Sequence, residues 1–247
     1  MPDEYEGVLA RNYDALYGVM RGPSGDAAFY RGLAEESGGP VLELGCGTGR
    51  VLLPIAALGI PCVGVDASPA MLAALRAKNP PPNLALVEGR METFDLGARR
   101  FRLVTAPFRA FLHLLDMPSQ LAALANIRRH LEPGGTFAFD IFDPKLAWIS
   151  APGENERLDA TFTIDGVETR RFAKVRTNLA TQIMDVTFRF EPAQTDGNTT
   201  VRLRWFYRYE MEHLLARAGF TDVTLYGGYD RRPWRPEGET VIVARAP

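Results

Sequence analysis

The sequence is poor in cysteine and has almost no net charge. Its 247 residues include two cysteines, Cys46 and Cys62, which are too few for a disulfide framework and lack the spacing of a zinc site. Lysine and arginine number 28 against 30 aspartates and glutamates, which gives a formal net charge of −2. This balance provides no general attraction to nucleic acid or to an anionic membrane. We therefore expect no metal, no nucleic-acid partner and no membrane partner.

Long apolar runs are also missing. No stretch approaches the ~18 residues that would suggest a membrane span, and the opening residues 1–4 are too acidic and polar for a signal peptide. Hydrophobic residues at 46% and charged residues at 23% are ordinary for a globular protein. We therefore expect a cytoplasmic enzyme, built as one large α/β domain or as a domain with a sizeable insertion.

The most informative stretch is 41–50, where a short apolar run ends in an acid and passes through Gly45, Gly47 and Gly49. This pattern is typical of a first parallel strand that turns into its helix and leaves bare backbone against a ligand. A dinucleotide fingerprint would need its third glycine at position 50, which is Arg50. A P-loop would need a Gly-Lys-Ser/Thr ending, and no lysine is present. The simpler alternative is a tight turn without a ligand.

A second acid ends the next predicted strand, 61–66. Asp66 lies about 20 positions after Gly45, where a carboxylate can accept hydrogen bonds from both ribose hydroxyls of a nucleotide-like ligand. The alternative is a plain loop or helix-cap acid, because Ser68-Pro69 is a typical start of the following helix.

Three motifs then follow one another in a fixed order: E-x-G-x-G-x-G at residues 43–49, Asp66, and the turn L-x-P-G-G at residues 131–135 before an apolar strand. This order resembles the class I S-adenosylmethionine-dependent methyltransferases of small-molecule type, including sugar amine N-methyltransferases and related methyltransferase-domain proteins. The resemblance implies an α/β fold with a doubly wound, mostly parallel, seven-stranded Rossmann-like sheet. It also implies S-adenosyl-L-methionine as the cofactor.

The resemblance further implies cofactor contacts. Glu43 would help to anchor the amino acid part of the cofactor, and Asp66 would bind the ribose. The segment from Tyr13 to Tyr17 resembles a lid that folds over the cofactor, although its helical spacing also suits a simple packing stripe. The predicted cofactor-binding residues are Tyr13, Tyr17, Glu43, Gly45, Cys46, Gly47, Gly49, Asp66, Ala67, Met71, Met91, Ala106 and Phe108.

One position departs from the family pattern. An acid that hydrogen-bonds the adenine amino group commonly follows the glycine after the third strand, but here Gly89 is followed by Arg90. Contact with adenine then falls to the backbone at Met91 or to Glu92.

His113 is the candidate catalytic residue. Imidazole is the usual general base near neutral pH, and a histidine lies at the matching place in the similar sugar amine N-methyltransferases. The alternative is a histidine that only packs the turn 111–114. The run 106–108 does not match the Asn/Asp-Pro-Pro-Tyr/Phe run of enzymes that methylate nucleobase amines, so nucleic-acid methylation is not expected.

The chain divides into four predicted parts. They are an N-terminal helical lid at 1–40, an S-adenosylmethionine-binding core at 41–150, an inserted β layer at 151–208, and a helix with strands at 209–247 that completes the core. The inserted part alternates polar and apolar residues and has hairpin signals at 165–166 and 196–198. We therefore predict an antiparallel meander of three or four strands, which serves as a substrate roof or as a dimer surface.

We expect S-adenosylmethionine-dependent transfer of a methyl group to an N or O atom of a small-molecule acceptor. An amine acceptor must arrive neutral, and His113 could take or redirect its proton. Two other functions share the motifs. One is a non-catalytic regulatory module that binds S-adenosylmethionine or a metabolite, and the other, which the glycine spacing disfavours, is an NAD-dependent oxidoreductase. A homodimer through the inserted β layer is a further expectation.

Overall fold

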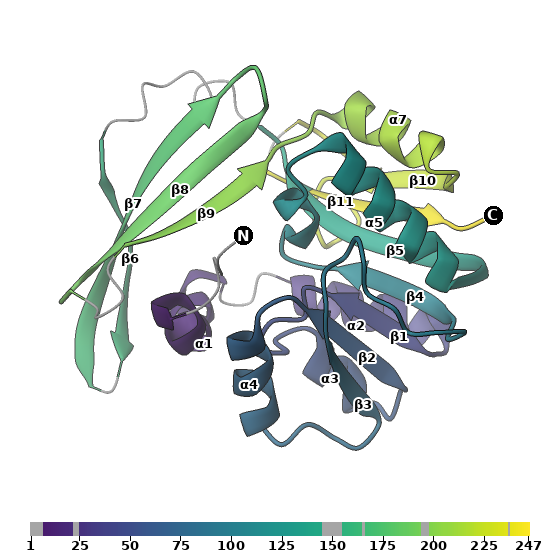
Figure 1. The fold of residues 1–247 in the computed structure, drawn as a ribbon, viewed down its shortest axis with the longest axis horizontal. Coiled ribbons are helices and arrows are strands. Elements are labelled where there is room, and N and C mark those ends of the chain that lie inside the picture. Colours follow the sequence, from purple (N-terminus) through teal and green to yellow (C-terminus); the bar gives the residue numbers. More distant parts are fainter. Residues whose placement is uncertain (1–6, 22–24, 145–154, 165, 194–197, 237) are drawn as a thin grey trace.

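The computed structural model describes residues 7–21, 25–144, 155–164, 166–193, 198–236 and 238–247. Two sheets dominate these residues (Figure 1). Sheet A has seven strands in the order β10-β11-β5-β4-β1-β2-β3, and sheet B has four strands in the order β6-β7-β8-β9. The hairpin signals at Asp165 and at 196–197 lie outside the described residues.

Sheet A is parallel except for one strand. Its members are β1 (Val41–Leu44), β2 (Cys62–Asp66), β3 (Leu84–Glu88), β4 (Phe101–Ala106), β5 (Leu131–Phe142), β10 (Thr221–Tyr226) and β11 (Glu239–Arg245). Strand β11 is antiparallel to both of its neighbours, β5 and β10. The winding reverses between β1 and β4, which pair in parallel, and open α/β sheets bind ligands at the carboxyl ends of the strands at such a point. The doubly wound, Rossmann-like prediction is confirmed.

Helices cover both faces of sheet A because parallel strands are buried on both sides. The helices are α2 (Asp26–Ser37), α3 (Leu52–Ala56) and α4 (Pro69–Ala77) on one face, and α5 (Met117–His130) and α7 (Arg208–Arg217) on the other. Side chains of β1 alternate between them: Val41 packs with the α2 and α3 side chains, whereas Leu42 and Leu44 pack with those of α5 and α7. Within the described ranges, no helix is long and apolar enough to cross a membrane.

Strand β5 begins earlier than the sequence pattern indicates. The apolar run predicts a strand over 137–142 after a separate glycine turn, but Leu131 already pairs with Phe101 of β4. The register then shifts, and Gly134 has a φ of 72°. The L-x-P-G-G motif is therefore an irregularity within β5, where the left-handed residue is a glycine because it has no Cβ.

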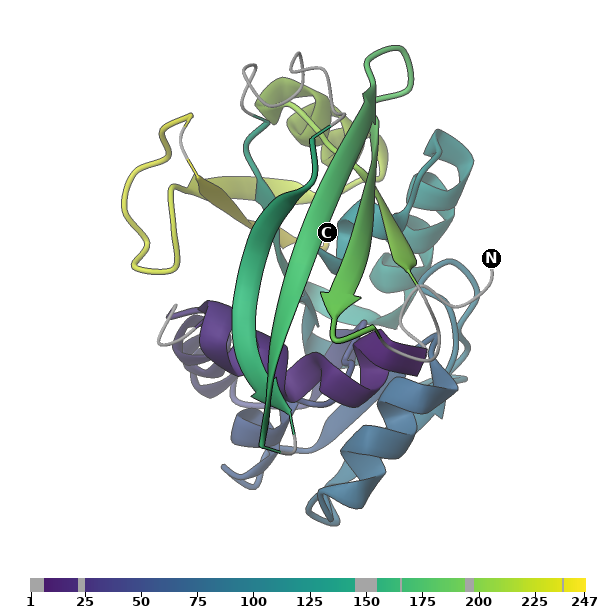
Figure 2. The same cartoon turned by 90° about the vertical axis from the view of Figure 1, so that its left-hand side faces the viewer.

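Sheet B is the predicted meander, and it has four antiparallel strands. They are β6 (Arg157–Ile164), β7 (Val167–Asn178), β8 (Ile183–Glu191) and β9 (Thr199–Arg204). Helix α1 (Gly7–Arg21) crosses these strands in Figure 2, and the two elements share one apolar cluster, to which Tyr17, Phe162 and Phe188 belong. The opposite face of sheet B carries ion pairs such as Arg189–Glu156. Sheet B therefore has one packed face and one charged face.

Candidate active site

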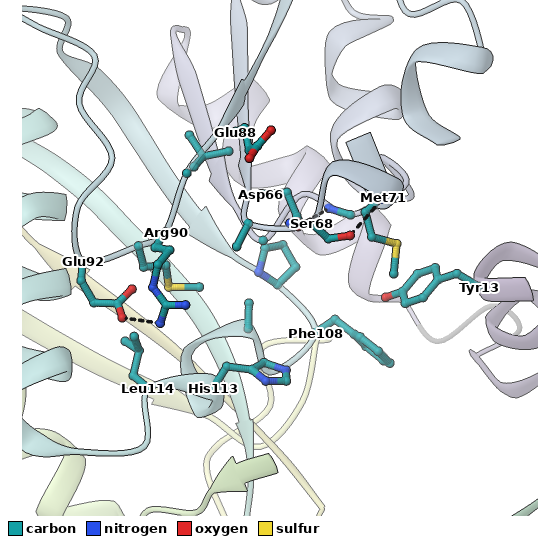
Figure 3. Close-up of a pocket in the computed structure, with 18 residues that line it drawn as sticks. Tyr13, Asp66, Ser68, Met71, Glu88, Arg90, Glu92, Phe108, His113 and Leu114 are labelled. Carbon is teal, nitrogen blue, oxygen red and sulfur yellow. Dashed lines mark hydrogen bonds and ion pairs between the residues drawn. The ribbon is translucent and has the colours of Figure 1, made fainter. Parts of the chain in front are cut away.

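A cavity of about 490 Å³ opens at the carboxyl ends of β1 to β4 (Figure 3). This volume lies within the ~300–1,000 Å³ of small-molecule sites. Tyr13 of α1 stands at one end and the Arg90–Glu92 pair at the other, while Phe108 and His113 lie along one side. The predicted site residues that line the cavity are Tyr13, Gly45, Gly47, Asp66, Ala67, Met71, Met91, Phe108 and His113.

The glycine turn leaves β1 under tight steric limits. The N–H groups of Gly45 and Cys46 both donate to the carbonyl of Val65, at 2.8 and 3.1 Å, which ties the turn to β2. Gly45 has a φ of 68°, and a Cβ on it would lie 2.9 Å from the Cβ of Ala110. A side chain at Gly45 would therefore fill the cradle between the turn and the opposite wall, which keeps the backbone open to a ligand.

Asp66 lies between this turn and the start of α4. Its Oδ2 accepts from the N–H of Gly47 at 2.7 Å, and its Oδ1 accepts from the N–H of Ser68 at 2.8 Å. Burial raises the pKa of Asp66, whereas the backbone hydrogen bonds and the charge of His113 lower it. Each carboxylate oxygen can accept more than one hydrogen bond, so Asp66 can also receive hydroxyl groups of a ligand. A bare glycine turn beside such a carboxylate is suited to S-adenosylmethionine.

The other end of the cavity carries a charged pair. Nη2 of Arg90 donates to Oε1 of Glu92 at 2.9 Å. The Arg90 side chain is 50% exposed but that of Glu92 only 13%, so the carboxylate is the inner member of the pair. Position 90, where the family pattern has an acid, is Arg90, but Glu92 provides a carboxylate two residues later. Glu92 and the Met91 backbone are the two groups that the sequence leaves for contact with adenine.

Helix α5 buttresses this loop from behind. Nδ2 of Asn126 donates to the carbonyls of Met91 and Phe94, at 3.2 and 2.9 Å. Nε2 of His130 accepts from the N–H of Leu96 at 3.4 Å, and its Nδ1 lies 2.9 Å from the carbonyl of Asn126. Burial lowers the pKa of His130. A neutral imidazole, with one N–H donor and one acceptor, satisfies both contacts.

Aromatic rings form the wall nearest α1. The ring of Phe108 stands edge-on to Tyr17 with centroids 4.9 Å apart, and it lies 6.5 Å from the ring of Tyr13. The guanidinium of Arg50 lies 5.4 Å from the centre of the same Phe108 ring. Tyr13 and Phe108 line the cavity, while Tyr17 supports them from outside the lining. His113 is half-buried at the end of the short helix η1 (Ala110–His113).

The other predicted cofactor residues lie behind the lining: Tyr17, Glu43, Cys46, Gly49 and Ala106. Glu43 alternates with Leu42 and Leu44 and therefore lies on the α2 and α3 side of sheet A, where it is 2% exposed. Burial raises the pKa of Glu43, and the charge of Arg50 opposes this. Cofactor binding by the five residues behind the lining, Glu43 among them, stays a prediction.

The lining also contains residues outside the predicted set: Val65, Ser68, Glu88, Gly89, Arg90, Glu92, Pro107, Ala110 and Leu114. Most of them are sequence neighbours of predicted residues. The signal that could have found them is strand topology, because the residues just beyond each parallel strand meet at the same edge of the sheet.

The fold, the glycine turn and Asp66 together define a site for a nucleotide-like cofactor, and comparison with known proteins gives the class of protein. Residues 41–135 match a methyltransferase domain family. The CcbJ methyltransferase from Streptomyces caelestis has 30% sequence identity with this chain, covers 96% of each chain and has a TM-score of 0.81. The chain belongs to the S-adenosylmethionine-dependent methyltransferases.

Two further relatives extend over almost the whole chain. The cypemycin N-terminal methyltransferase from a Streptomyces species is 27% identical and covers 98% of this chain and 97% of its own length. The S-adenosylmethionine-bound amino pentose methyltransferase from Micromonospora echinaspora, involved in calicheamicin biosynthesis, is 26% identical, covers 98% of both chains and has a TM-score of 0.70. The predicted enzyme class and cofactor are confirmed.

Proposed function

We propose that this methyltransferase acts on an amino group of a small molecule. The observation that carries the proposal is the charge of the cavity. Among the described residues that line it, Asp66, Glu88 and Glu92 carry carboxylates, whereas Arg90 carries the guanidinium and is already paired with Glu92. Asp66 and Glu92 would hold the cofactor, so Glu88 is the lining charge left for an acceptor, and it favours a basic acceptor over one that carries a phosphate or carboxylate. Two relatives are named for acceptors that carry an amine, a peptide N-terminus and an amino pentose, which supports nitrogen over oxygen.

Three groups of the chain would hold the cofactor. Asp66 would accept the ribose hydroxyls, and the backbone at Gly45 and Gly47 would pack against the amino acid part. Glu92 would accept a hydrogen bond from the adenine amino group, because Arg90 fixes its carboxylate at the inner end of the pair. In this arrangement Arg90 acts only through Glu92.

Held by these groups, S-adenosylmethionine would supply an electrophilic methyl group for the acceptor nitrogen, with a neutral thioether as the leaving group. The protein supplies orientation and excludes water. Tyr13 and Phe108 form an apolar wall beside the cavity. His113 faces the same cavity as Asp66 and would take the proton that the acceptor amine loses.

Sheet B would serve as the roof over the acceptor. Its packed face lies against α1, whose Tyr13 reaches the cavity. Its outer face is covered by ion pairs, among them Arg189–Glu156 and Arg202–Asp185, and such a face is stable in water. The predicted homodimer through sheet B and the predicted cytoplasmic location need their own measurements, light scattering for the first and cell fractionation for the second.

Product analysis tests the acceptor class directly. The enzyme is incubated with S-adenosylmethionine and matched pairs of acceptors, an amino sugar with its hydroxyl analogue and a short peptide with its N-acetylated form. We expect methyl transfer to the amine member of a pair, detected by mass spectrometry. Transfer to the hydroxyl analogue would overturn the amine proposal. Tight binding of S-adenosylmethionine by calorimetry, without transfer to any acceptor of a broad panel, would favour the regulatory module.

A further inference from the structure

The turn that leaves β4 has a strained backbone. Phe108 and Arg109 have φ values of 56° and 65°, so two consecutive residues with bulky side chains occupy the left-handed region. Such residues are uncommon there, and the strain persists only where the surroundings hold it in place. Both residues border the site, because Phe108 lines the cavity and Arg109 directly precedes η1, which carries His113.

One buried carboxylate holds this turn. Oδ1 of Asp140 accepts from the N–H of Phe108 at 2.7 Å, and Oδ2 accepts from the N–H of Arg109 at 3.0 Å. Oδ1 also accepts from the hydroxyl of Tyr30 at 2.7 Å. Asp140 is fully buried on β5, one residue beyond Phe139, which pairs with the last residue of β4. Successive N–H groups of this kind form a concave anion site, and here the anion is part of the chain.

We propose that Asp140 is a positioning residue for methyl transfer. Its two oxygens fix the left-handed turn at Phe108–Arg109, and through this turn they set both the Phe108 wall and the start of the helix that carries His113. Asp140 lies outside the cavity lining, so it acts without touching substrate. The inference rests on the proposed function in one respect, that an amine acceptor is used to measure turnover.

The substitution Asp140→Asn separates this role from simple packing. An amide has one oxygen acceptor, so its NH₂ group must face one of the two backbone N–H groups that the carboxylate now satisfies. Burial and then the charge of Glu239 raise the pKa of Asp140, whereas the hydrogen bonds from Tyr30 and Phe108 and the charge of Arg109 lower it. The asparagine side chain is nearly equal in volume to that of aspartate, so the substitution creates no cavity.

Tyr30→Phe is the matched control. It removes a hydrogen bond to the same Asp140 oxygen but leaves both backbone hydrogen bonds of the turn in place. If Asp140 only satisfied buried polar groups, the two variants would lose thermal stability and would keep the turnover of the folded enzyme. The proposal instead expects Tyr30→Phe to keep turnover while Asp140→Asn loses it.

The experiment measures kcat with the amine acceptor, the affinity for S-adenosylhomocysteine, and amide hydrogen exchange of the 105–114 segment. We expect Asp140→Asn to lower kcat by about 10- to 100-fold, the effect of misplacing catalytic groups, with nearly unchanged S-adenosylhomocysteine affinity and faster exchange in the segment. Wild-type kcat with wild-type exchange would overturn the proposal. Exchange and S-adenosylhomocysteine binding need no acceptor, so a wrong acceptor class would leave these two readouts intact.

A double-mutant cycle with Arg109→Gly tests the strain itself. Glycine adopts a φ of 65° without penalty, although this change also removes the ion pair between Arg109 and Glu239. The single Arg109→Gly variant measures that loss. We expect Arg109→Gly to lower kcat much less in the Asp140→Asn background than in the wild type, because glycine relieves the strain at position 109 and the turn then depends less on the carboxylate. Strictly additive effects would contradict the role of Asp140 in holding the turn.

Discussion

The two sides of the cavity are built differently. On the side proposed for the cofactor, formed by the turn 45–49, Asp66–Ser68 and Arg90–Glu92, the key contacts join residues that are close in sequence or on adjacent strands. On the side proposed for the acceptor, formed by Tyr13 of α1 and the turn 108–113 with sheet B packed on α1 behind them, the contacts join distant segments, as when Tyr17 meets Phe108. The cofactor side is therefore fixed by local motifs, and the acceptor side by tertiary packing. Changes on the first should alter cofactor affinity, and changes on the second should alter turnover.

The largest effect is expected in the roof, from Phe188→Ala. Phe188 is 8% exposed in the cluster that joins sheet B to α1, and its ring lies 4.1 Å from the guanidinium of Arg171. The free energy of unfolding should fall by about 3 kcal/mol in urea titrations, and turnover should fall more than S-adenosylhomocysteine affinity. Phe172→Ala on the outer face of sheet B is the control, with a smaller loss. Equal losses from both variants would contradict a packed roof.

His113→Ala should come next. Removal of a general base lowers turnover by about 100-fold, while S-adenosylhomocysteine affinity measured by calorimetry should stay close to that of the wild type. His213→Ala provides the control, because His213 is exposed on α7. Equal kcat in His113→Ala and His213→Ala would remove His113 from the mechanism.

On the cofactor side, Asp66→Asn should weaken S-adenosylhomocysteine binding by roughly 10- to 100-fold, because hydrogen bonds to a charged group are lost. Calorimetry measures the change, and Asp95→Asn, at an exposed acid outside the cavity lining, should have no effect. A fall in kcat without any loss of S-adenosylhomocysteine affinity would contradict the assignment of Asp66 to the cofactor side.

Glu92→Gln should have a smaller effect with a change of preference. Loss of the acceptor for the adenine amino group should weaken S-adenosylhomocysteine binding by about 2- to 10-fold. The glutamine amide can donate to the oxygen of hypoxanthine, so binding of S-inosylhomocysteine should improve. Arg90→Ala keeps the carboxylate and should keep the preference for adenine. An unchanged ratio of the two affinities in Glu92→Gln would show that Glu92 does not contact the base.

The smallest effect concerns the pH dependence of stability through His130, which supports the Met91–Leu96 loop. The pKa of His130 lies below its ordinary value because of burial, so the unfolded chain takes up the proton first. The stability from neutral His130 is therefore fully present above pH ~6.5 and is lost as the pH falls through the lower folded-state pKa. Urea unfolding at pH 7.5 and 5.5 should show a smaller pH dependence in His130→Gln than in the wild type. Identical pH dependence would contradict this.

The sequence predicts the cofactor side better than the acceptor side for a physical reason. The glycine turn and Asp66 are local patterns whose geometry follows from strand-to-helix turns, and they meet at one edge of sheet A. The side of β1 on which Glu43 lies follows from the alternation of side chains along a strand, whereas the helices that cover this side are a tertiary feature. The contacts of Asp140 could not be predicted from the sequence, because its partners Tyr30 and Phe108 lie far away along the chain and no motif relates them.

The strand order of sheet B has a consequence for exchange between relatives. Each of its strands pairs only with the strand next to it in sequence, β6 with β7, β7 with β8 and β8 with β9. The chain leaves sheet A after β5 and returns at α7, so the whole sheet is one insertion at one connection. Hairpin pairing of neighbours forms from local contacts and does not depend on the order in which the core strands assemble. Sheet B is therefore a single exchangeable insertion, and under the proposed roof role, grafting it from a relative onto this core should change the acceptor.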